Sequence, residues 1–266
     1  SAKRQDINKI GKFGVGFKAV FAYTGTPKVY SGDFAFEIRD LVVPVPIDRT
    51  VTDAGTRFVF PFNAGRKSQA QALDQISKGL LTLADTTLLF LHNIEEISWS
   101  IDGREDGYIT RLAHSESHIE IERTDGKNKS SSHFLRFSAP STACEGRNVA
   151  LAYQLAFREE GQVLFKTAVP LPQQMKIVPA VGSVCIYFPA DKETSKLRFH
   201  LHAPFASTVA RDSVQDRPEN EDLLDELAGL ACASLHSIRD QGLLSTEFLE
   251  VLPLEEDGLS TFYAPI

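Results

Sequence analysis

Three glycines stand close together near the N-terminus, in the stretch IGKFGVGFKAVF at residues 10 to 21. They are Gly11, Gly14 and Gly16. Because glycine has no Cβ, it permits positive φ angles and lets another group approach the main chain closely. A glycine-rich turn that leads into a helix can point several backbone N–H groups, and the positive end of the helix dipole, at an anion. The stretch therefore indicates a phosphate-binding loop, with tight packing of a turn as the alternative.

Two widespread phosphate loops do not fit this stretch. The dinucleotide-binding fingerprint needs G-x-G-x-x-G after an apolar strand, whereas the order here is G-x-x-G-x-G and residues 1 to 9 are polar. The P-loop of nucleotide triphosphatases needs Lys after the last glycine of G-x-x-x-x-G, and Phe17 follows Gly16 here. The glycines must therefore belong to another kind of loop.

The other polar residues give weaker signals. His200 and His202 would lie on one face of a strand, which can begin a metal site, but no third ligand stands nearby and a polar strand face explains them equally well. We therefore predict no metal site in the chain. The three cysteines show no C-x-x-C spacing, so neither a zinc knuckle nor a disulfide framework is supported, and a reducing, cytoplasmic location fits best.

Length and composition are those of a globular protein. The 266 residues suffice for one large or two medium domains, and no apolar run approaches the roughly 18 to 20 residues of a membrane span. We therefore expect no membrane association. The net charge of -7 argues against broad, nonspecific binding of nucleic acid.

The elements that would position the glycine loop follow it directly. A short helix is expected over residues 17 to 25, followed by strands within residues 28 to 47 that turn at 31 to 33. The next strand, at residues 55 to 62, would carry Phe58, Phe60 and Phe62 on one face. A helical period then begins at Ser68 and continues through leucines as far as Leu91, although residues 85 to 89 can interrupt it.

The rest of the chain alternates short strands with turns and ends in a long helix. Pro218 opens this helix and Gly242 lies beyond its end. One stripe of the helix carries Leu223, Leu224, Leu227, Leu230 and Leu235. Strands are expected within residues 95–102, 107–113, 117–125, 131–139, 148–157 and 183–190.

With these elements in order, the chain resembles the GHKL ATPase superfamily, which includes gyrase, the ninety-kilodalton heat-shock chaperone, histidine kinases and MutL. The likeness is greatest to chaperone-like ATPase modules of the sacsin type. It is carried by IGKFGVGF at residues 10 to 17, by the Gly55-Thr56 pair that opens the Phe-rich strand, and by HAPFASTVARDSV at residues 202 to 214. It is strong over residues 10 to 62 and looser over residues 180 to 240.

The resemblance implies an α+β chain with three parts. Residues 1–65 would be the C-terminal half of a GHKL (Bergerat) α/β sandwich that binds ATP. Residues 66–98 would form a helical connection, and residues 99–266 a split βαβ-type transducer, or middle, domain.

The resemblance also implies roles for individual residues. Thr56 would approach the adenine. Arg211, which is followed by Asp212, would be the catalytic residue of this chain and would reach the γ-phosphate. A guanidinium is suited to this role because it offers several fixed hydrogen-bond donors to a phosphate. The residues that would line the phosphates are Gly11, Lys12, Gly14, Val15, Gly16 and Phe17.

Other parts of the family's ATP site precede its glycine loop. They are a catalytic Glu, an Asn that binds Mg²⁺, and the Asp of D-x-G-x-G that binds the adenine amine. We therefore expect these groups upstream of Ser1, in a longer protein. Without them the 266-residue chain alone should neither hydrolyse ATP nor bind it tightly.

The leading hypothesis is an ATP-binding, ATP-hydrolysing conformational switch of the chaperone-like GHKL type. One alternative is a non-hydrolysing interaction scaffold that uses the β-rich region after residue 98 as its docking surface. A second is a relative of the DNA-repair and topoisomerase enzymes of the superfamily, which the acidic charge disfavours. A homodimer is compatible with the resemblance, and the sequence identifies no protein client.

Overall fold

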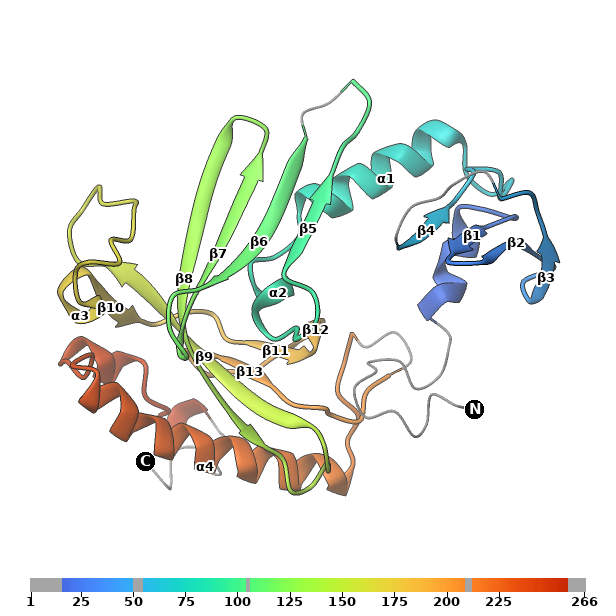
Figure 1. Ribbon diagram of the computed structural model, residues 1–266. Coiled ribbons are helices and arrows are strands. Elements are labelled where there is room, and N and C mark those ends of the chain that lie inside the picture. Colours follow the sequence, from blue (N-terminus) through green and yellow to red (C-terminus); the bar gives the residue numbers. More distant parts are fainter. Residues whose placement is uncertain (1–15, 50–54, 104–105, 209–211, 258–266) are drawn as a thin grey trace. The chain divides into compact units, whose positions relative to one another are not determined.

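The structure of the chain is a computed structural model that describes residues 16–49, 55–103, 106–208 and 212–257. These residues form two compact units, the first ending at Thr82 and the second beginning at Leu83. Each unit combines helices with a largely antiparallel sheet, so the protein belongs to the α+β class (Figure 1). Within the described residues no helix is both long and apolar enough to cross a membrane.

The first unit is a four-stranded antiparallel sheet between a short 3-10 helix and an α-helix. Its strand order is β3-β2-β1-β4. Its elements are η2 (Gly16–Ala22), β1 (Lys28–Ser31), β2 (Phe34–Arg39), β3 (Val43–Pro46), β4 (Thr56–Val59) and α1 (Gln69–Leu81).

Alternation of side chains gives this sheet one apolar face and one more polar face. The register places Val29 opposite both Phe36 and Phe58, so these three side chains share a face, while Lys28 and Glu37 share the other. Gly32 makes the turn between β1 and β2 with a φ of +54°, a region that favours glycine. The predicted strands and turn within residues 28 to 47 are confirmed; the short helix is a 3-10 helix that ends at Ala22, and the strand expected at residues 55–62 covers only Thr56–Val59.

Helix α1 is shorter than its sequence pattern suggests. It begins with a capping box, in which the Ser68 hydroxyl accepts the Gln71 N–H at 3.2 Å and the Gln71 side chain accepts the Ser68 N–H at 2.9 Å. The helix ends at Leu81. The helical face therefore does not continue to Leu91; the interruption that the sequence allowed at residues 85 to 89 comes earlier, after Leu81, and the later leucines belong to the second unit.

The second unit is built on one large sheet. The strand order is β12-β11-β13-β9-β8-β7-β6-β5, and β10 pairs with the C-terminal end of β9, residues 154 to 157. Its strands are β5 (Glu96–Trp99), β6 (Gly107–Ala113), β7 (His118–Asp125), β8 (Asn128–Pro140), β9 (Asn148–Phe157), β10 (Met175–Val178), β11 (Ser183–Ile186), β12 (Phe188–Thr194) and β13 (His200–His202). Its helices are α2 (Thr86–Leu89), α3 (Leu171–Gln174), α4 (Pro218–Asp240), η3 (Glu247–Glu250) and η4 (Glu255–Asp257).

The expected split βαβ-type arrangement is not found among these strands. The one parallel pairing of the described sheet joins β11 to β13, and the chain between them forms β12. A βαβ unit needs a helix in that crossover. The described sheet is instead built mainly from antiparallel neighbours.

Helix α4 covers one face of this sheet, against β8 and β9 (Figure 1). Pro218 occupies its first turn, and Gly242 follows its end with a φ of +72°. Leu223, Leu227 and Ile238 are buried, and Leu224, Leu230 and Leu235 pack at the edge of the same core. The predicted helix and its apolar stripe are confirmed.

The opposite face is covered by α2 and the chain after it, which buries Leu88, Leu89, Phe90 and Leu91. Arginines of the sheet hold this segment by hydrogen bonds to its carbonyl groups. Arg111 donates to Leu88 and Arg136 to Leu89, both at 2.9 Å. The guanidinium groups thus satisfy carbonyls at the end of a short helix, which otherwise lack partners.

One predicted strand is divided in two. The stretch at residues 183 to 190 was expected to be continuous, but Tyr187 adopts a φ of +71° and separates β11 from β12. The two strands then pair with each other, Ile186 opposite Phe188. The Tyr187 hydroxyl accepts a hydrogen bond from Arg147 at 2.6 Å, a tertiary contact that holds the residue in this uncommon conformation.

Candidate functional site

Gly16 and Phe17 are the described end of the predicted phosphate loop; Gly11, Lys12, Gly14 and Val15 lie outside the described residues. Gly16 begins η2. A Cβ placed on Gly16 would meet no described atom within 4 Å. Packing against the described residues therefore gives no reason for a glycine here, and the space is open to a ligand.

Phe17 joins the end of the glycine loop to the strand of the Gly55-Thr56 motif. Its ring centroid lies 5.9 Å from that of Phe58 in β4 and 6.2 Å from that of Phe60. Phe21, one turn later in η2, lies edge-on to Phe17 at 6.4 Å. Aromatic contacts of this kind contribute roughly 0.5–1.5 kcal/mol beyond the area they bury.

The side chain of Asn63 provides a second link between the chain after η2 and the chain after β4. Its Oδ1 accepts the Gly25 N–H at 2.7 Å and the Thr24 hydroxyl at 3.3 Å, and its Nδ2 donates to the Thr26 hydroxyl at 3.0 Å. Thr24 is fully buried. These bonds position η2 on the sheet independently of the aromatic cluster.

Thr56 is the exposed first residue of β4. It pairs with Ser31 of β1, and the two hydroxyl oxygens lie 2.7 Å apart. A hollow beside it is lined by Tyr30, Ser31, Gly55 and Arg57, among others. A Cβ on Gly55 would meet no described atom within 4 Å, as at Gly16.

Arg211, the predicted γ-phosphate ligand, lies outside the described residues, but its neighbour Asp212 is described. The Asp212 carboxylate lies 2.5 Å from the Lys192 ammonium and accepts the Thr208 hydroxyl at 2.8 Å. Hydrogen bonds from Lys192 and then Thr208 lower the pKa of Asp212 below its usual value. The residue after Arg211 is thus fixed to β12.

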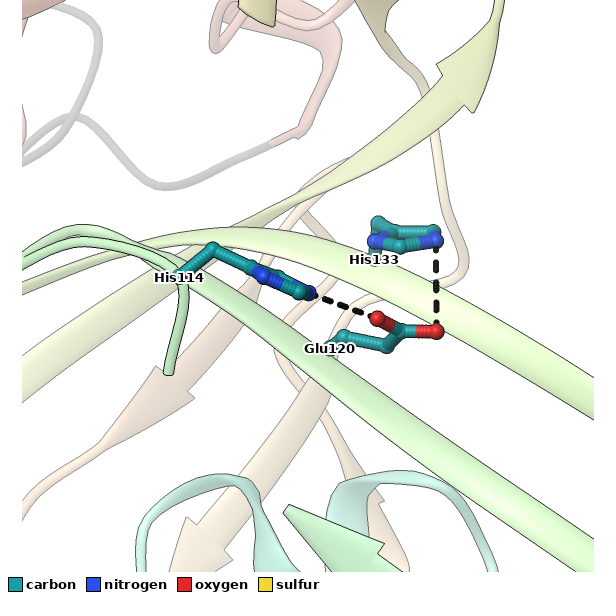
Figure 2. Close-up of side chains that lie close together, drawn as sticks. All are labelled: His114, Glu120 and His133. Carbon is teal, nitrogen blue, oxygen red and sulfur yellow. Dashed lines mark hydrogen bonds and ion pairs between the residues drawn. The ribbon is translucent and has the colours of Figure 1, made fainter. Parts of the chain in front are cut away.

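A second candidate site, which the sequence analysis missed, lies on the sheet of the second unit. His114, Glu120 and His133 each point one ligand atom to a common point, and these atoms all lie within 4.8 Å of one another. The Nε2 of His114 is 2.6 Å from one Glu120 carboxylate oxygen, and the Nε2 of His133 is 3.8 Å from the other. Figure 2 shows the carboxylate between the two imidazole rings.

The topology of the sheet explains this convergence. Glu120 of β7 pairs directly with His133 of β8, so both side chains leave the same face. His114 follows the last residue of β6 and is held there because its backbone N–H donates to the His118 carbonyl at 2.9 Å. Two paired strands and the turn that follows β6 therefore contribute to the cluster.

A third histidine and an aromatic ring complete the surroundings. The Nε2 of His118 lies 3.1 Å from the Nδ1 of His133, and the Phe165 ring packs on His114 and His118 with centroids 4.7 and 4.6 Å apart. Burial, followed by the nearby His133, lowers the pKa of His118 to about 4. Burial is also the largest cause that lowers the pKa of His133.

His200 and His202 do not join this cluster. Both lie buried in β13, where the Nδ1 of His200 accepts the Ser183 N–H at 3.1 Å and the ring of His202 stacks on Phe90 at 5.3 Å. Burial lowers the pKa of each imidazole to about 4. They are neutral core residues, and not a polar strand face as the sequence suggested.

The sequence did contain a signal for the missed cluster. A two-residue turn at Gly126 and Lys127 joins β7 to β8, with Gly126 at a φ of +70°. Counting residue by residue back from that turn pairs Glu120 with His133. The two predicted strands, combined with this turn, would have placed both residues on one face.

Comparisons of the chain with protein-family models, with curated proteins and with solved structures found no match.

Proposed function

We propose that the protein is an ATP-binding, ATP-hydrolysing conformational switch of the GHKL type, in which the first unit forms part of the ATP-binding sandwich. The observation that carries the proposal is the contact between Phe17 and Phe58. It brings together two motifs that stand about forty residues apart and that the resemblance assigns to one nucleotide site.

The two glycines of these motifs support a ligand that approaches the backbone. Gly16 and Gly55 each have open space where a Cβ would stand. A glycine costs conformational entropy on folding, and close approach of another group to the main chain offsets that cost. Phosphate oxygens bound by backbone N–H groups make such an approach.

The apolar face of the first sheet supports a sandwich with a further layer. Phe34 and Phe58 lie on this face and are 71% and 50% exposed. A sheet with one apolar face needs a second layer over it. We assign that cover to the remainder of the same ATP-binding domain, as the resemblance implies.

Arg211 remains our candidate for the γ-phosphate ligand. Asp212, the next residue, is bound by Lys192 and Thr208 within the second unit. An arginine delivered from a second domain contributes mainly when the module closes, so it favours the transition state over the bound ground state. The protein would thereby couple ATP hydrolysis to domain movement.

The experiment measures ATP binding in the presence of Mg²⁺ by calorimetry, in the protein that carries this chain in its natural context. Gly16→Val should eliminate measurable binding, because the added side chain fills the space that the phosphates need. Gly79→Ala is the matched control, since Gly79 lies in α1 and a Cβ there also meets nothing within 4 Å. Unchanged ATP affinity in Gly16→Val, with the fold intact, would overturn the phosphate-loop assignment.

Turnover of the same protein tests Arg211. Arg211→Ala should lower kcat by at least about tenfold while ATP affinity changes little. Arg239→Ala, at an exposed arginine near the end of α4, should change neither quantity. If the unaltered protein binds no ATP, the switch is refuted and a non-hydrolysing scaffold becomes the better description.

A further inference from the structure

The cluster of His114, Glu120 and His133 has the chemistry of a transition-metal site. Two imidazole nitrogens and one carboxylate oxygen are the ligands of many zinc sites that leave a fourth position open. With metal–ligand bonds of about 2.0 to 2.1 Å, tetrahedral ligand atoms stand about 3.3 Å apart. In the structure one ligand atom from each of the three residues lies within 4.8 Å of the other two, so small side-chain shifts would bring them to that spacing.

His118 supplies the partner that a metal-binding histidine needs. When the Nε2 of His133 faces a metal, its Nδ1 carries the proton and can donate to the Nε2 of His118, 3.1 Å away. Such hydrogen bonds set the tautomer and the ring orientation of a ligand. The Ser131 hydroxyl oxygen lies 3.2 Å from the Nε2 of His133.

Burial gives the cluster a fixed geometry. The exposed fractions of the His114, Glu120 and His133 side chains are 19%, 13% and 2%. Phe165 packs on one side and Phe157 lies edge-on to His133, with centroids 5.4 Å apart. Rings held by packing on neighbouring strands lose little freedom when they bind an ion.

The charges around the cluster also favour a cation. Among the described residues the ion-pair partners of Glu120 are His114 and His133, whereas the next carboxylate on the same face, Glu122, pairs with Lys129 at 2.6 Å. A divalent ion would neutralise this largely buried carboxylate, which forms no ion pair with a Lys or Arg of the described residues.

We propose that His114, Glu120 and His133 bind one Zn²⁺ ion, with His118 orienting His133 and a fourth position left for water. Nitrogen ligands select zinc over Mg²⁺ and Ca²⁺, which prefer oxygen. None of these four residues is among those assigned to the proposed nucleotide site, which lie within residues 11 to 17 and at Thr56 and Arg211. The zinc proposal and the nucleotide proposal can therefore be tested independently.

The test begins with the 266-residue chain stripped of metal by a chelator and titrated with Zn²⁺. Calorimetry and elemental analysis should give one tightly held ion per chain, and Mg²⁺ or Ca²⁺ should not displace it. Co²⁺ placed in the same site should show the visible absorption bands of a four- or five-coordinate ion with nitrogen ligands. Absence of a bound ion at one per chain would overturn the proposal.

Variants then locate the ion. Glu120→Gln keeps the size of the side chain and removes its charge, and should weaken Zn²⁺ binding by at least about a hundredfold. His118→Phe should weaken it by about ten- to a hundredfold, because His133 loses its orienting partner. His133 is left unchanged in this series, since truncating a side chain that is 2% exposed would disturb the fold.

Two controls complete the design. His236→Ala removes an exposed histidine of α4 and should leave Zn²⁺ affinity unchanged, as should Gly16→Val in the other unit. Far-ultraviolet circular dichroism verifies that each variant is folded. Equal Zn²⁺ affinity in Glu120→Gln and in the unaltered chain would show that this histidine and glutamate cluster is a hydrogen-bonded structural element without a metal.

Discussion

Gly182 is the position where adding one methyl group should damage the second unit most. It is buried immediately before β11, and a Cβ there would lie 2.0 Å from the Ser195 hydroxyl oxygen. It would also lie 2.3 Å from the Phe199 carbonyl oxygen and 2.6 Å from that of Leu197. Two of these three atoms are backbone, so rotation of a side chain cannot relieve the overlap.

The size of the effect follows from these distances. Ordinary contact begins at 3.4 Å, so the main chain at Phe199 would have to retreat by about 1 Å in a close-packed core. The same movement would strain the hydrogen bond from the Gly182 N–H to the Leu197 carbonyl, 3.1 Å in length. Overpacking of this kind costs about 3 kcal/mol, the upper end of its usual range.

Gly229 provides a matched control with the same chemical change. It lies inside α4, and a Cβ there would meet no described atom within 4 Å. Alanine is favoured over glycine by about 1 kcal/mol in a helix interior. Gly182→Ala should therefore be destabilising, while Gly229→Ala should be neutral or stabilising by up to that amount.

Urea unfolding followed by tryptophan fluorescence measures both variants. Trp99 is the single tryptophan of the chain and is buried in the second unit, so it reports on the unit that carries both glycines. With a slope of about 2 kcal/mol per molar urea, Gly182→Ala should lower the midpoint by about 1.5 M. A Gly182→Ala midpoint equal to that of the unaltered chain would refute the packing argument.

Two further predictions use the same assay. Burial lowers the pKa values of His200 and His202 to about 4 in the folded chain. As the pH falls below 6.5, these imidazoles are therefore protonated in the unfolded chain before they are protonated in the folded chain. The free energy of unfolding should therefore decrease between pH 6.5 and 4 by up to about 3 kcal/mol for each histidine. His202→Phe should show a smaller decrease over this range than the unaltered chain. Equal pH dependence in the two proteins would contradict this prediction. Arg136→Ala should lower the free energy of unfolding by about 2 kcal/mol, because the buried carbonyl of Leu89 loses its charged donor at 2.9 Å. Arg239→Ala, at an exposed arginine, should change it by no more than about 0.5 kcal/mol. Similar unfolding midpoints for the two variants would contradict the role of the hydrogen bond from Arg136.

Local patterns in the sequence were sufficient for most of the secondary structure. The alternation in FAFEIR over residues 34 to 39 predicts a strand with one apolar face, and the leucine stripe between Pro218 and Gly242 predicts α4 with both of its ends. These predictions hold because side-chain period and terminal signals act over a few neighbouring residues. The break at Tyr187 was not predictable in this way, since its positive φ is supported by Arg147, forty residues away.

The sequence by itself determined the α+β class and most strands and helices, while the phosphate-binding role of its glycine-rich loop stays a prediction. Only the tertiary structure decided which polar residues meet. It buries His200 and His202 as neutral core groups and brings together Glu120 of β7, His133 of β8 and His114, which follows β6. The physical reason is that a strand pattern specifies which side chains share a face, while cross-strand register, set by turns and long-range pairing, specifies which of them become neighbours.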